Sequence, residues 1–441
     1  MKNLNIRALS FVCLLFGFSI NSYAVPSIQT AQLDNGLTIL LVEAHNVPMV
    51  SLQLTTPAGS RFDTINKAGT ASMLATILGD HTAKHNDKAW AEWLDSEAIR
   101  LGASASRDTL SLSLTVVRDS LPVGLDAFSE ALLQPGWYKK RFLSLREDGI
   151  AAAIKSQETP GTQAAQATAK LLYGSHGYGH TTSGTAKSLP HIQLNDLKTL
   201  YTNQVRPVGS VLAVSGDITM QEILRLLKPR LKTWQGKPSV AALDIKQPSV
   251  VRRKSSHVTI PTSQALVQFS RLGIARSNHD FFPLFVMNHL LGGGGFGSKL
   301  MEEVREKRGL VYGVYSYFIP LAAPGPFIIT LQTRAEQAEK AAQVVRDVMK
   351  TLADGKIDKK QLDATKSNLV GSFAQRMDSN RERVGLLSMI GFYQMPLDYL
   401  QNWTAHVQSV TLSDVRRMAK AYLQTDDWNI LQVGPAKEKK H

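Results

Sequence analysis

The sequence is 441 residues long, 43% of them hydrophobic, with a formal net charge of +14. This length favours two or more domains, and the composition is that of a globular protein. The basic residues are dispersed except in the C-terminal KEKKH run, which favours a solvated basic surface over a nucleic-acid-binding patch. No segment after the N-terminal region is long and apolar enough to span a membrane. We therefore expect neither nucleic acid nor a membrane span.

The first 24 residues have the form of an export signal. Lys2 and Arg7 precede a mostly apolar run over 8–20. Ser22-Tyr23-Ala24 then supplies small residues at a cleavage position. We expect cleavage after Ala24 and a periplasmic location. The only cysteine, Cys13, lies inside this segment, so the mature chain is expected to have no disulfide and no Cys-ligated metal.

Residues 25–236 are expected to form a first domain that opens with a hairpin. The dipeptide Asn35-Gly36 is a hairpin-turn signal inside the apolar segment LDNGLTILLVE. The patterns that follow predict strands at 48–56 and 103–117, helices at 67–78, 87–101 (with Asp87 as N-cap), 120–133 and 138–157, and a helix followed by a strand over 194–218.

A similar order of elements recurs after residue 240. It predicts strands at 263–274 and 325–334, helices at 279–291, 335–353, 359–376 and 380–393, and a closing helix and strand over 412–435. Such a duplication indicates two copies of an α+β domain. Residues 237–252 are rich in Pro, Lys and small residues, so we expect a linker there, before a second domain over 253–441.

The helix predicted at 67–78, KAGTASMLATIL, has the spacing of an inverted zinc motif without its ligands. Ser72, Ala75 and Thr76 stand where the pattern H-x-x-E-H has its first histidine, its glutamate and its second histidine. That pattern places two imidazoles on one helix face with a carboxylate to activate the metal-bound water. A hydroxymethyl, a methyl and a threonine side chain cannot do this. We therefore expect no zinc in this chain.

Five segments in order resemble the pitrilysin/insulinase-like family of inverted-motif zinc peptidases, over essentially the whole mature chain. They are LDNGLTILLVE, AGSRFD leading into the degenerate helix, LLYGSHGYGHTTSGTAKSL with Gly177 in place of the family's proline, VRPVGSVLAVSGDI, and LGGGGFGSKLMEEVREKRGLVYGVYSYF. The resemblance implies two homologous α/β roll domains, each a mixed sheet packed by helices, joined by a linker in a clamshell around a substrate chamber.

The resemblance also implies a distal glutamate ligand on the helix that holds REDGIAAAIKSQETP. Glu147 and Glu158 are the only candidates there, and we expect both to be solvated carboxylates rather than ligands. Both halves of the zinc site are then missing, and this agreement argues against an accident at a single position.

Arg305 and Tyr312 match the family's arginine and tyrosine, seven residues apart, which reach into the catalytic chamber. The resemblance implies that Arg305 binds substrate backbone and that Tyr312 stabilises the tetrahedral oxyanion. The chemistry agrees, because guanidinium is a fixed fork of donors for carbonyl or carboxylate groups and a phenol can donate to developing negative charge. The alternative is a surface arginine in the EEVREKR charge run and an ordinary strand tyrosine.

The glycine cluster ahead of this pair predicts a flexible or close-approach loop. Adjacent glycines are costly in chain entropy and are not expected in core packing. No Gly-Lys-Ser/Thr follows, so it is not a phosphate loop. We expect it to touch substrate peptide or a partner subunit; the alternative is a plain helix-terminating linker. The residues assigned to this loop are Gly292, Gly293, Gly294, Gly295 and Ser298.

The other reactive side chains are expected to have no catalytic or metal-binding role. His81 and His85 are expected to be exposed loop histidines, because four-residue spacing does not converge two imidazoles in a loop and no glutamate lies between them. The HGYGH cluster, His176 to His180, is expected to be structural, as the resemblance implies. Ser72 lacks a Gly-x-Ser-x-Gly elbow, which argues against a serine peptidase.

These features together predict a non-catalytic, exported subunit of a heteromeric zinc endopeptidase. A homologous partner with an intact motif would hold the zinc, and this chain would contribute Arg305 and Tyr312 to the binding of peptide substrates. Two alternatives remain: a non-enzymatic peptide-binding or scaffold protein of the cell envelope, and a self-sufficient hydrolase with an unrecognised site.

Overall fold

The computed structural model describes residues 27–249 and 254–436. The expected export signal and residues 250–252 of the expected linker lie outside these ranges. Within them, the strands are β1 Gln29–Gln32, β2 Thr38–Glu43, β3 Met49–Thr56, β4 Arg100–Ala105, β5 Leu110–Val117, β6 Val211–Gly216, β7 Ser255–Thr259, β8 Gln264–Leu272, β9 Gly313–Phe318, β10 Pro326–Arg334 and β11 Asn429–Gly434. No described helix is long and apolar enough to cross a membrane.

The helices of the described chain divide between the two halves of the sequence. The first half holds α1 Thr70–Asp80, α2 Asp87–Ser96, α3 Leu121–Leu133, α4 Lys139–Ser156, α5 Pro160–Tyr173, α6 Leu194–Gln204 and α7 Met220–Leu231. The second half holds α8 Phe281–Asn288, α9 Ala338–Ala353, α10 Lys359–Gly371, α11 Asn380–Phe392, α12 Tyr399–Ser409 and α13 Leu412–Tyr422.

Two mixed sheets of similar topology form the two halves. The first runs β1-β2-β6-β3-β5-β4 and the second runs β7-β11-β8-β10-β9. In each sheet one parallel pair, β2 with β6 or β7 with β11, is followed by antiparallel strands. The predicted α+β class is therefore confirmed, and the repeated order of elements in the sequence corresponds to a repeated sheet.

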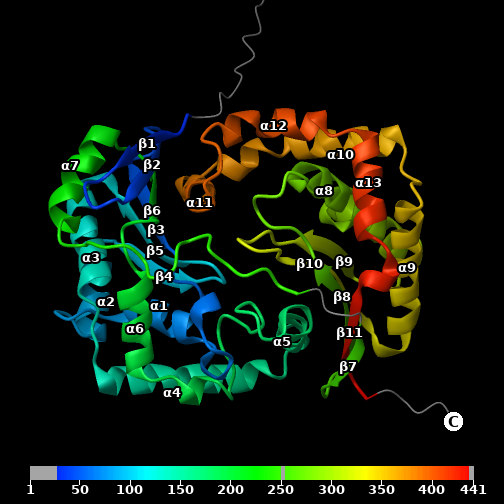
Figure 1. Ribbon diagram of the computed structural model, residues 1–441, viewed down its shortest axis with the longest axis horizontal. Coiled ribbons are helices and arrows are strands. Elements are labelled where there is room, and N and C mark those ends of the chain that lie inside the picture. Colours follow the sequence, from blue (N-terminus) through cyan, green and yellow to red (C-terminus); the bar gives the residue numbers. More distant parts are fainter. Residues whose placement is uncertain (1–26, 250–253, 437–441) are drawn as a thin grey trace, which may run out of the picture.

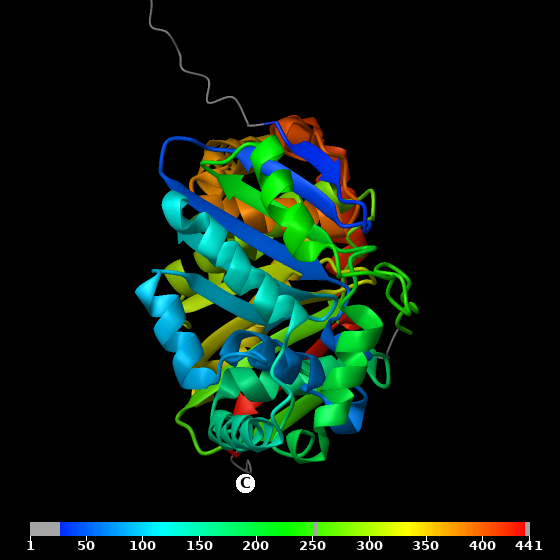
Figure 2. The ribbon, with the colours of Figure 1, turned by 90° about the vertical axis from the view of Figure 1, so that its left-hand side faces the viewer.

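Outer helices cover one face of each sheet and form the two main cores. In Figure 2, which looks at the first half from outside, α3 and α7 lie in front of the strands. The alternation of β5 follows from this arrangement, because Leu112 and Leu114 point into the core while Ser113 points to the other face and is exposed. Burial of such a leucine contributes about 2 kcal/mol, which fixes the register of the strand.

The inner face of each sheet is covered by a helix from the opposite half. Helix α5 packs on β8 and β11, and α11 packs on β6, β3 and β2; Figure 1 shows both helices between the two halves. Hydrogen bonds join each helix to the sheet that it covers. Gln268 of β8 donates to Thr168 of α5 at 2.5 Å, and Asn380 of α11 donates to the Met49 carbonyl of β3 at 3.1 Å. Because α11 of the second half covers the inner face of the first sheet, both faces of β2 are buried. This explains why β2 is apolar at successive positions.

A buried carboxylate joins the halves at a second place. Asp108, in the turn between β4 and β5, is fully buried. It accepts hydrogen bonds from the Tyr178 hydroxyl, the Tyr393 hydroxyl at 3.0 Å and the Ala322 backbone N–H at 2.8 Å. Burial and the nearby Asp108 raise the pKa of both tyrosines, so both hydroxyls remain protonated donors. Ala322 and Tyr393 belong to the second half, so Asp108 links the two.

The structure corrects three expectations about the first half. The helix expected at 87–101 ends at Ser96, and Ala98, two residues later, has a positive φ of 51°. The N-cap of this helix is Asn86 rather than Asp87. The single strand expected at 103–117 is two strands, β4 and β5. The turn between them is closed by the Ser106 N–H bonding to the Thr109 carbonyl at 2.7 Å. It lacks the Asn-Gly or Asp-Gly pair that marks a hairpin in sequence.

Candidate functional site

Helix α1 holds the three degenerate motif positions. It begins after Gly69, whose φ of 105° suits glycine, and the buried Asp63 carboxylate accepts from the N–H groups of Gly69 at 2.9 Å and Ala71 at 3.1 Å. Burial raises the pKa of Asp63 to about 7, against the opposing effect of these backbone donors. The first turn of the degenerate helix is thus capped without any ligand chemistry.

Side chains at the motif positions bond only to their own helix. Ala75 is buried in the first core. Thr76 is exposed, and its hydroxyl donates to the Ser72 carbonyl of its own helix at 3.1 Å. Glu147 on α4 and Glu158 before α5 are both exposed. In residues 27–249 and 254–436 no three His, Cys, Asp or Glu side chains group closely enough to hold a metal ion.

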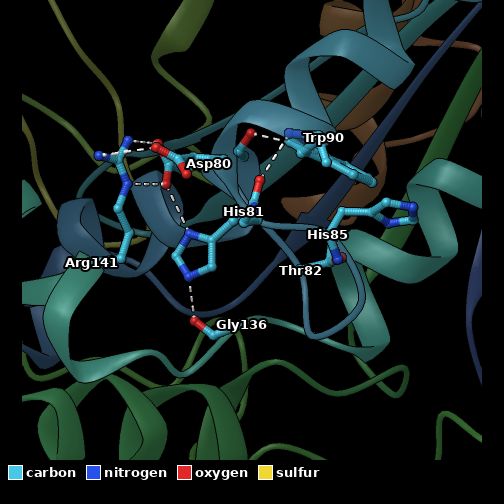
Figure 3. A network of polar contacts seen from close by, with 11 residues as sticks. Asp80, His81, Thr82, His85, Trp90, Gly136 and Arg141 are labelled. Carbon is cyan, nitrogen blue, oxygen red and sulfur yellow. Dashed lines mark hydrogen bonds and ion pairs between the residues drawn. The ribbon is translucent and has the colours of Figure 1, made fainter.

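His81 is buried, so the expectation of an exposed loop histidine was wrong. Its side chain is 1% exposed and both ring nitrogens are occupied (Figure 3). Nδ1 lies 2.8 Å from Asp80 Oδ2, and Nε2 lies 2.6 Å from the Gly136 carbonyl oxygen. Protein oxygens thus lie within hydrogen-bond distance of both ring nitrogens, so neither nitrogen is open to a metal. The closeness of the α3–α4 connection to the end of α1 could not be read from local spacing.

His85 is half-buried and belongs to a different cluster. Its Nδ1 lies 2.8 Å from Glu130 Oε1, and its ring stacks on Trp93 with centroids 5.1 Å apart. Thr82 also donates to Glu130, at 2.5 Å. His81 and His85 therefore face different partners and form no common site.

Asp80 ties the end of α1 to α4 through Arg141. The guanidinium donates to both carboxylate oxygens, at 2.6 and 2.8 Å (Figure 3). Burial opposes the charge of Asp80, but hydrogen bonds from Arg141 and His81 outweigh it and hold the pKa of Asp80 below its usual value. The ion pair crosslinks the degenerate helix and the helix that carries Glu147.

The Asp80 contacts should stabilise the fold only where Asp80 is ionised. The folded-state pKa is lowered, so the contribution is complete above the unfolded pKa near 4 and is lost as the pH falls through the folded value. Asp80→Asn should therefore lower the free energy of unfolding by about 1–3 kcal/mol at pH 7, with a difference from wild type that shrinks below pH 4. Urea unfolding between pH 3 and 7 measures this. The exposed Asp95→Asn on α2 is the control and should show no such trend.

The HGYGH segment is built into the junction between the halves. Tyr178 is fully buried and donates to Asp108, while His176 Nε2 lies 2.7 Å from the Lys246 carbonyl oxygen of the connecting segment. A Cβ at Gly177 would lie 2.5 Å from the Arg61 carbonyl oxygen, so a proline has no room there. His180 is buried, and burial lowers its pKa, so its ring is neutral near pH 7.

The glycine cluster is partly core, contrary to the expectation of a loop alone. Gly292 is buried in a π-helical segment, His289–Gly293, that continues α8, and a Cβ there would lie 2.7 Å from the Ser316 backbone nitrogen. Close approach to β9 therefore requires glycine at this position. Ser298 is also buried, and its hydroxyl donates to the Gly295 carbonyl at 2.7 Å. Phe296 in the same segment is 66% exposed.

Arg305 contacts this segment, and in the described residues neither Arg305 nor Tyr312 makes a side-chain hydrogen bond or ion pair. Arg305 is half-buried on the π-helical segment Met301–Glu306, with its guanidinium 4.7 Å from the centroid of the Phe296 ring. In the described chain no carboxylate pairs with it, whereas Glu302, Glu303, Lys307 and Arg308 pair with one another or with Lys299. Tyr312 precedes β9 and is 86% exposed. Sequence reasoning nominated Arg305 and Tyr312 but gave no role to Phe296, whose ring lies against Arg305.

Comparisons with known proteins agree with this geometry. The family model described as insulinase (peptidase family M16) matches residues 38–194, and the model described as peptidase M16 inactive domain matches 191–369. A non-peptidase homologue, YmxG of Helicobacter pylori, is 25% identical over 412 residues, covering 91% of this chain and 93% of its own length. An uncharacterized zinc protease of Streptomyces coelicolor is 23% identical over 426 residues, covering 95% of this chain and 92% of its own length.

A solved structure matches the fold almost end to end. It is a peptidase M16 inactive domain from Pseudomonas fluorescens, with a TM-score of 0.88 and 33% sequence identity. The match covers 94% of this chain and 99% of that chain. The arrangement of two related sheets therefore has a solved counterpart of similar extent.

Proposed function

Because the chain belongs to the peptidase M16 (insulinase) family as a non-catalytic member, we propose that it is the substrate-holding subunit of an exported zinc endopeptidase. In this proposal a homologous partner with an intact H-x-x-E-H motif supplies the zinc and the general-base glutamate, and the assembly acts in the periplasm. The present chain supplies Arg305 and Tyr312, which bind the peptide backbone and the oxyanion that forms when water attacks the scissile carbonyl.

One observation carries the proposal. The zinc positions are Ser72, Ala75 and Thr76, while the guanidinium of Arg305 lacks a carboxylate partner in the described chain and the Tyr312 side chain is 86% exposed. The polar groups of both side chains are therefore available to hydrogen-bond a ligand. A chain that had lost all function would not be expected to keep Arg305 and Tyr312 while losing the zinc ligands.

The proposal is tested by assaying the chain alone and with a partner. The purified chain should contain less than about 0.1 zinc per molecule by mass spectrometry and should cleave no peptide, because the ligands are absent. Co-expression with an intact-motif homologue from the same genome should give a copurifying complex that holds zinc and cleaves peptides. Stoichiometric zinc in the isolated chain, or a partner whose activity is indifferent to this chain, would contradict the proposal.

A further inference from the structure

The turn between β1 and β2 contains the only Asn-Gly pair of the sequence, Asn35-Gly36. In such a pair the glycine nitrogen can attack the side-chain amide carbon of the asparagine, because glycine has no side chain to hinder the approach. The attack forms a cyclic succinimide, and the amide group leaves as ammonia with the proton of the glycine nitrogen. Water then opens the ring to aspartate or isoaspartate. An Asn-Gly pair that is free to move is therefore open to spontaneous deamidation.

In the folded chain both reacting groups are engaged in hydrogen bonds. The Gly36 N–H donates to a carbonyl across the turn at 2.8 Å. Asn35 is only 8% exposed, and its Nδ2 donates to the carbonyl oxygens of Leu231 at 3.2 Å and Trp234 at 3.0 Å. Its Oδ1 accepts from the Leu37 N–H at 3.1 Å. The side-chain amide therefore cannot turn toward the Gly36 nitrogen without breaking these bonds.

The fold requires both members of the pair. Gly36 has a φ of 89°, and a Cβ there would lie 2.7 Å from Val208 Cγ2, so this position is restricted to glycine. The position of Asn35 needs a side chain that donates with one atom and accepts with the other, which an amide does and a carboxylate does not. The turn is thus built from the dipeptide that is prone to deamidation.

Deamidation would turn this contact into a repulsive one. A carboxylate has no donor for the carbonyls of Leu231 and Trp234, and it would add negative charge at the C-terminal end of α7, where the helix dipole is already negative. Isoaspartate would also add a methylene group to the backbone inside the turn. Lys228 and Lys232 line the small cavity at Asn35 and can attract the new charge, but the two carbonyls still lose their donor.

We propose that Asn35-Gly36 is a deamidation site that is closed in the folded protein and open in the unfolded chain. Deamidation then marks molecules that have stayed unfolded and weakens their return to the native fold. The effect reaches the core of the first half, because Leu37 and Trp234, which lie on either side of the contact, are both buried there. This behaviour needs neither zinc nor a partner subunit, so it is independent of the proposed function.

Mass-spectrometric peptide mapping of the full chain, after incubation at neutral pH with and without urea, tests the site. In the native chain Asn35 should stay intact. In urea it should deamidate roughly 10-fold faster than the exposed Asn66, which is followed by a lysine rather than a glycine. When the chain aged in urea is diluted and the native fraction is isolated by gel filtration, molecules deamidated at Asn35 should be depleted from that fraction roughly 10-fold.

Asn35→Asp tests the consequence directly. It should raise the equilibrium constant for unfolding by roughly 10- to 100-fold in urea titrations, because two buried carbonyls lose their donor. Asn66→Asp, at an exposed position, is the matched control and should leave the urea midpoint unchanged. If Asn35→Asp does not refold at all, the depletion measured on the aged wild-type chain still decides the matter, because that chain begins with the native residue.

Three results would overturn the proposal. The first is equal deamidation of Asn35 in the native chain and in urea, which would show that the fold does not close the site. The second is deamidation of Asn66 in urea at the same rate as Asn35. The third is a deamidated chain or an Asn35→Asp variant with the urea midpoint of the wild type, which would show that the neighbouring lysines compensate for the lost donor.

Discussion

Tyr312→Phe should lower the kcat of the zinc-bearing complex by a factor of about 100 to 1,000, which is the usual cost of removing one oxyanion donor. The ring and its position stay, so KM should change little and the loss should appear in the chemical step. The prediction rests on the proposed function and on the 86% exposure of the Tyr312 side chain. Steady-state kinetics on a quenched fluorescent peptide measure it.

Arg305 supplies a different interaction and should give a different kinetic signature. If Arg305 binds the peptide as proposed, Arg305→Ala removes donors used before and during the reaction, so KM should rise together with a fall in kcat/KM. Tyr138→Phe, which removes a half-exposed phenol from the first half, is the control and should leave both constants unchanged. Normal activity in the Arg305→Ala, Tyr312→Phe double variant would refute the role assigned to the pair.

Asp108→Ala should lower the free energy of unfolding by about 3 to 5 kcal/mol, the largest stability effect we expect from a single polar residue. The change removes a buried acceptor and leaves the Tyr178 and Tyr393 hydroxyls and the Ala322 N–H without their partner. Each buried donor left unpaired costs about 1–3 kcal/mol, which more than offsets the desolvation of the carboxylate.

Urea denaturation measures this effect against a matched control. Asp119→Ala removes an exposed carboxylate just after β5 and should change stability by less than about 0.5 kcal/mol. Asp108→Asn keeps one acceptor oxygen and should fall between the two. A loss for Asp108→Ala no larger than that of the control would show that the junction between the halves does not depend on this carboxylate.

Much of the fold followed from local patterns in the sequence. The hairpin at Asn35-Gly36 and the long helices α3, α4 and α9 could be predicted because turn chemistry and amphipathic period act within a few residues. The degenerate face of α1 was predictable for the same reason, since Ser72 and Thr76 are one turn apart. The motif context also nominated Arg305 and Tyr312, whose role stays a prediction.

The remaining features depend on which segments meet in space. An amphipathic period shows that a helix has an apolar face, but not which sheet that face covers, so the exchange of α5 and α11 was not predicted. His81 was expected to be exposed because nothing near it in sequence indicates that Gly136 lies within 2.6 Å of its ring. Asp108 carried no signal either, because its three donors come from three distant parts of the chain.

The crossed positions of α5 and α11 bear on how the chain reaches its native state. Neither half can cover the inner face of its own sheet. The first sheet is covered by α11 from the second half, and the second sheet is covered by α5 from the first half. During synthesis the chain therefore exposes the inner face of the first sheet until α11 is made, some 160 residues after β6. Contacts of such high sequence separation form late and slowly. A cut in the connecting segment should yield two fragments that are soluble only as a complementary pair.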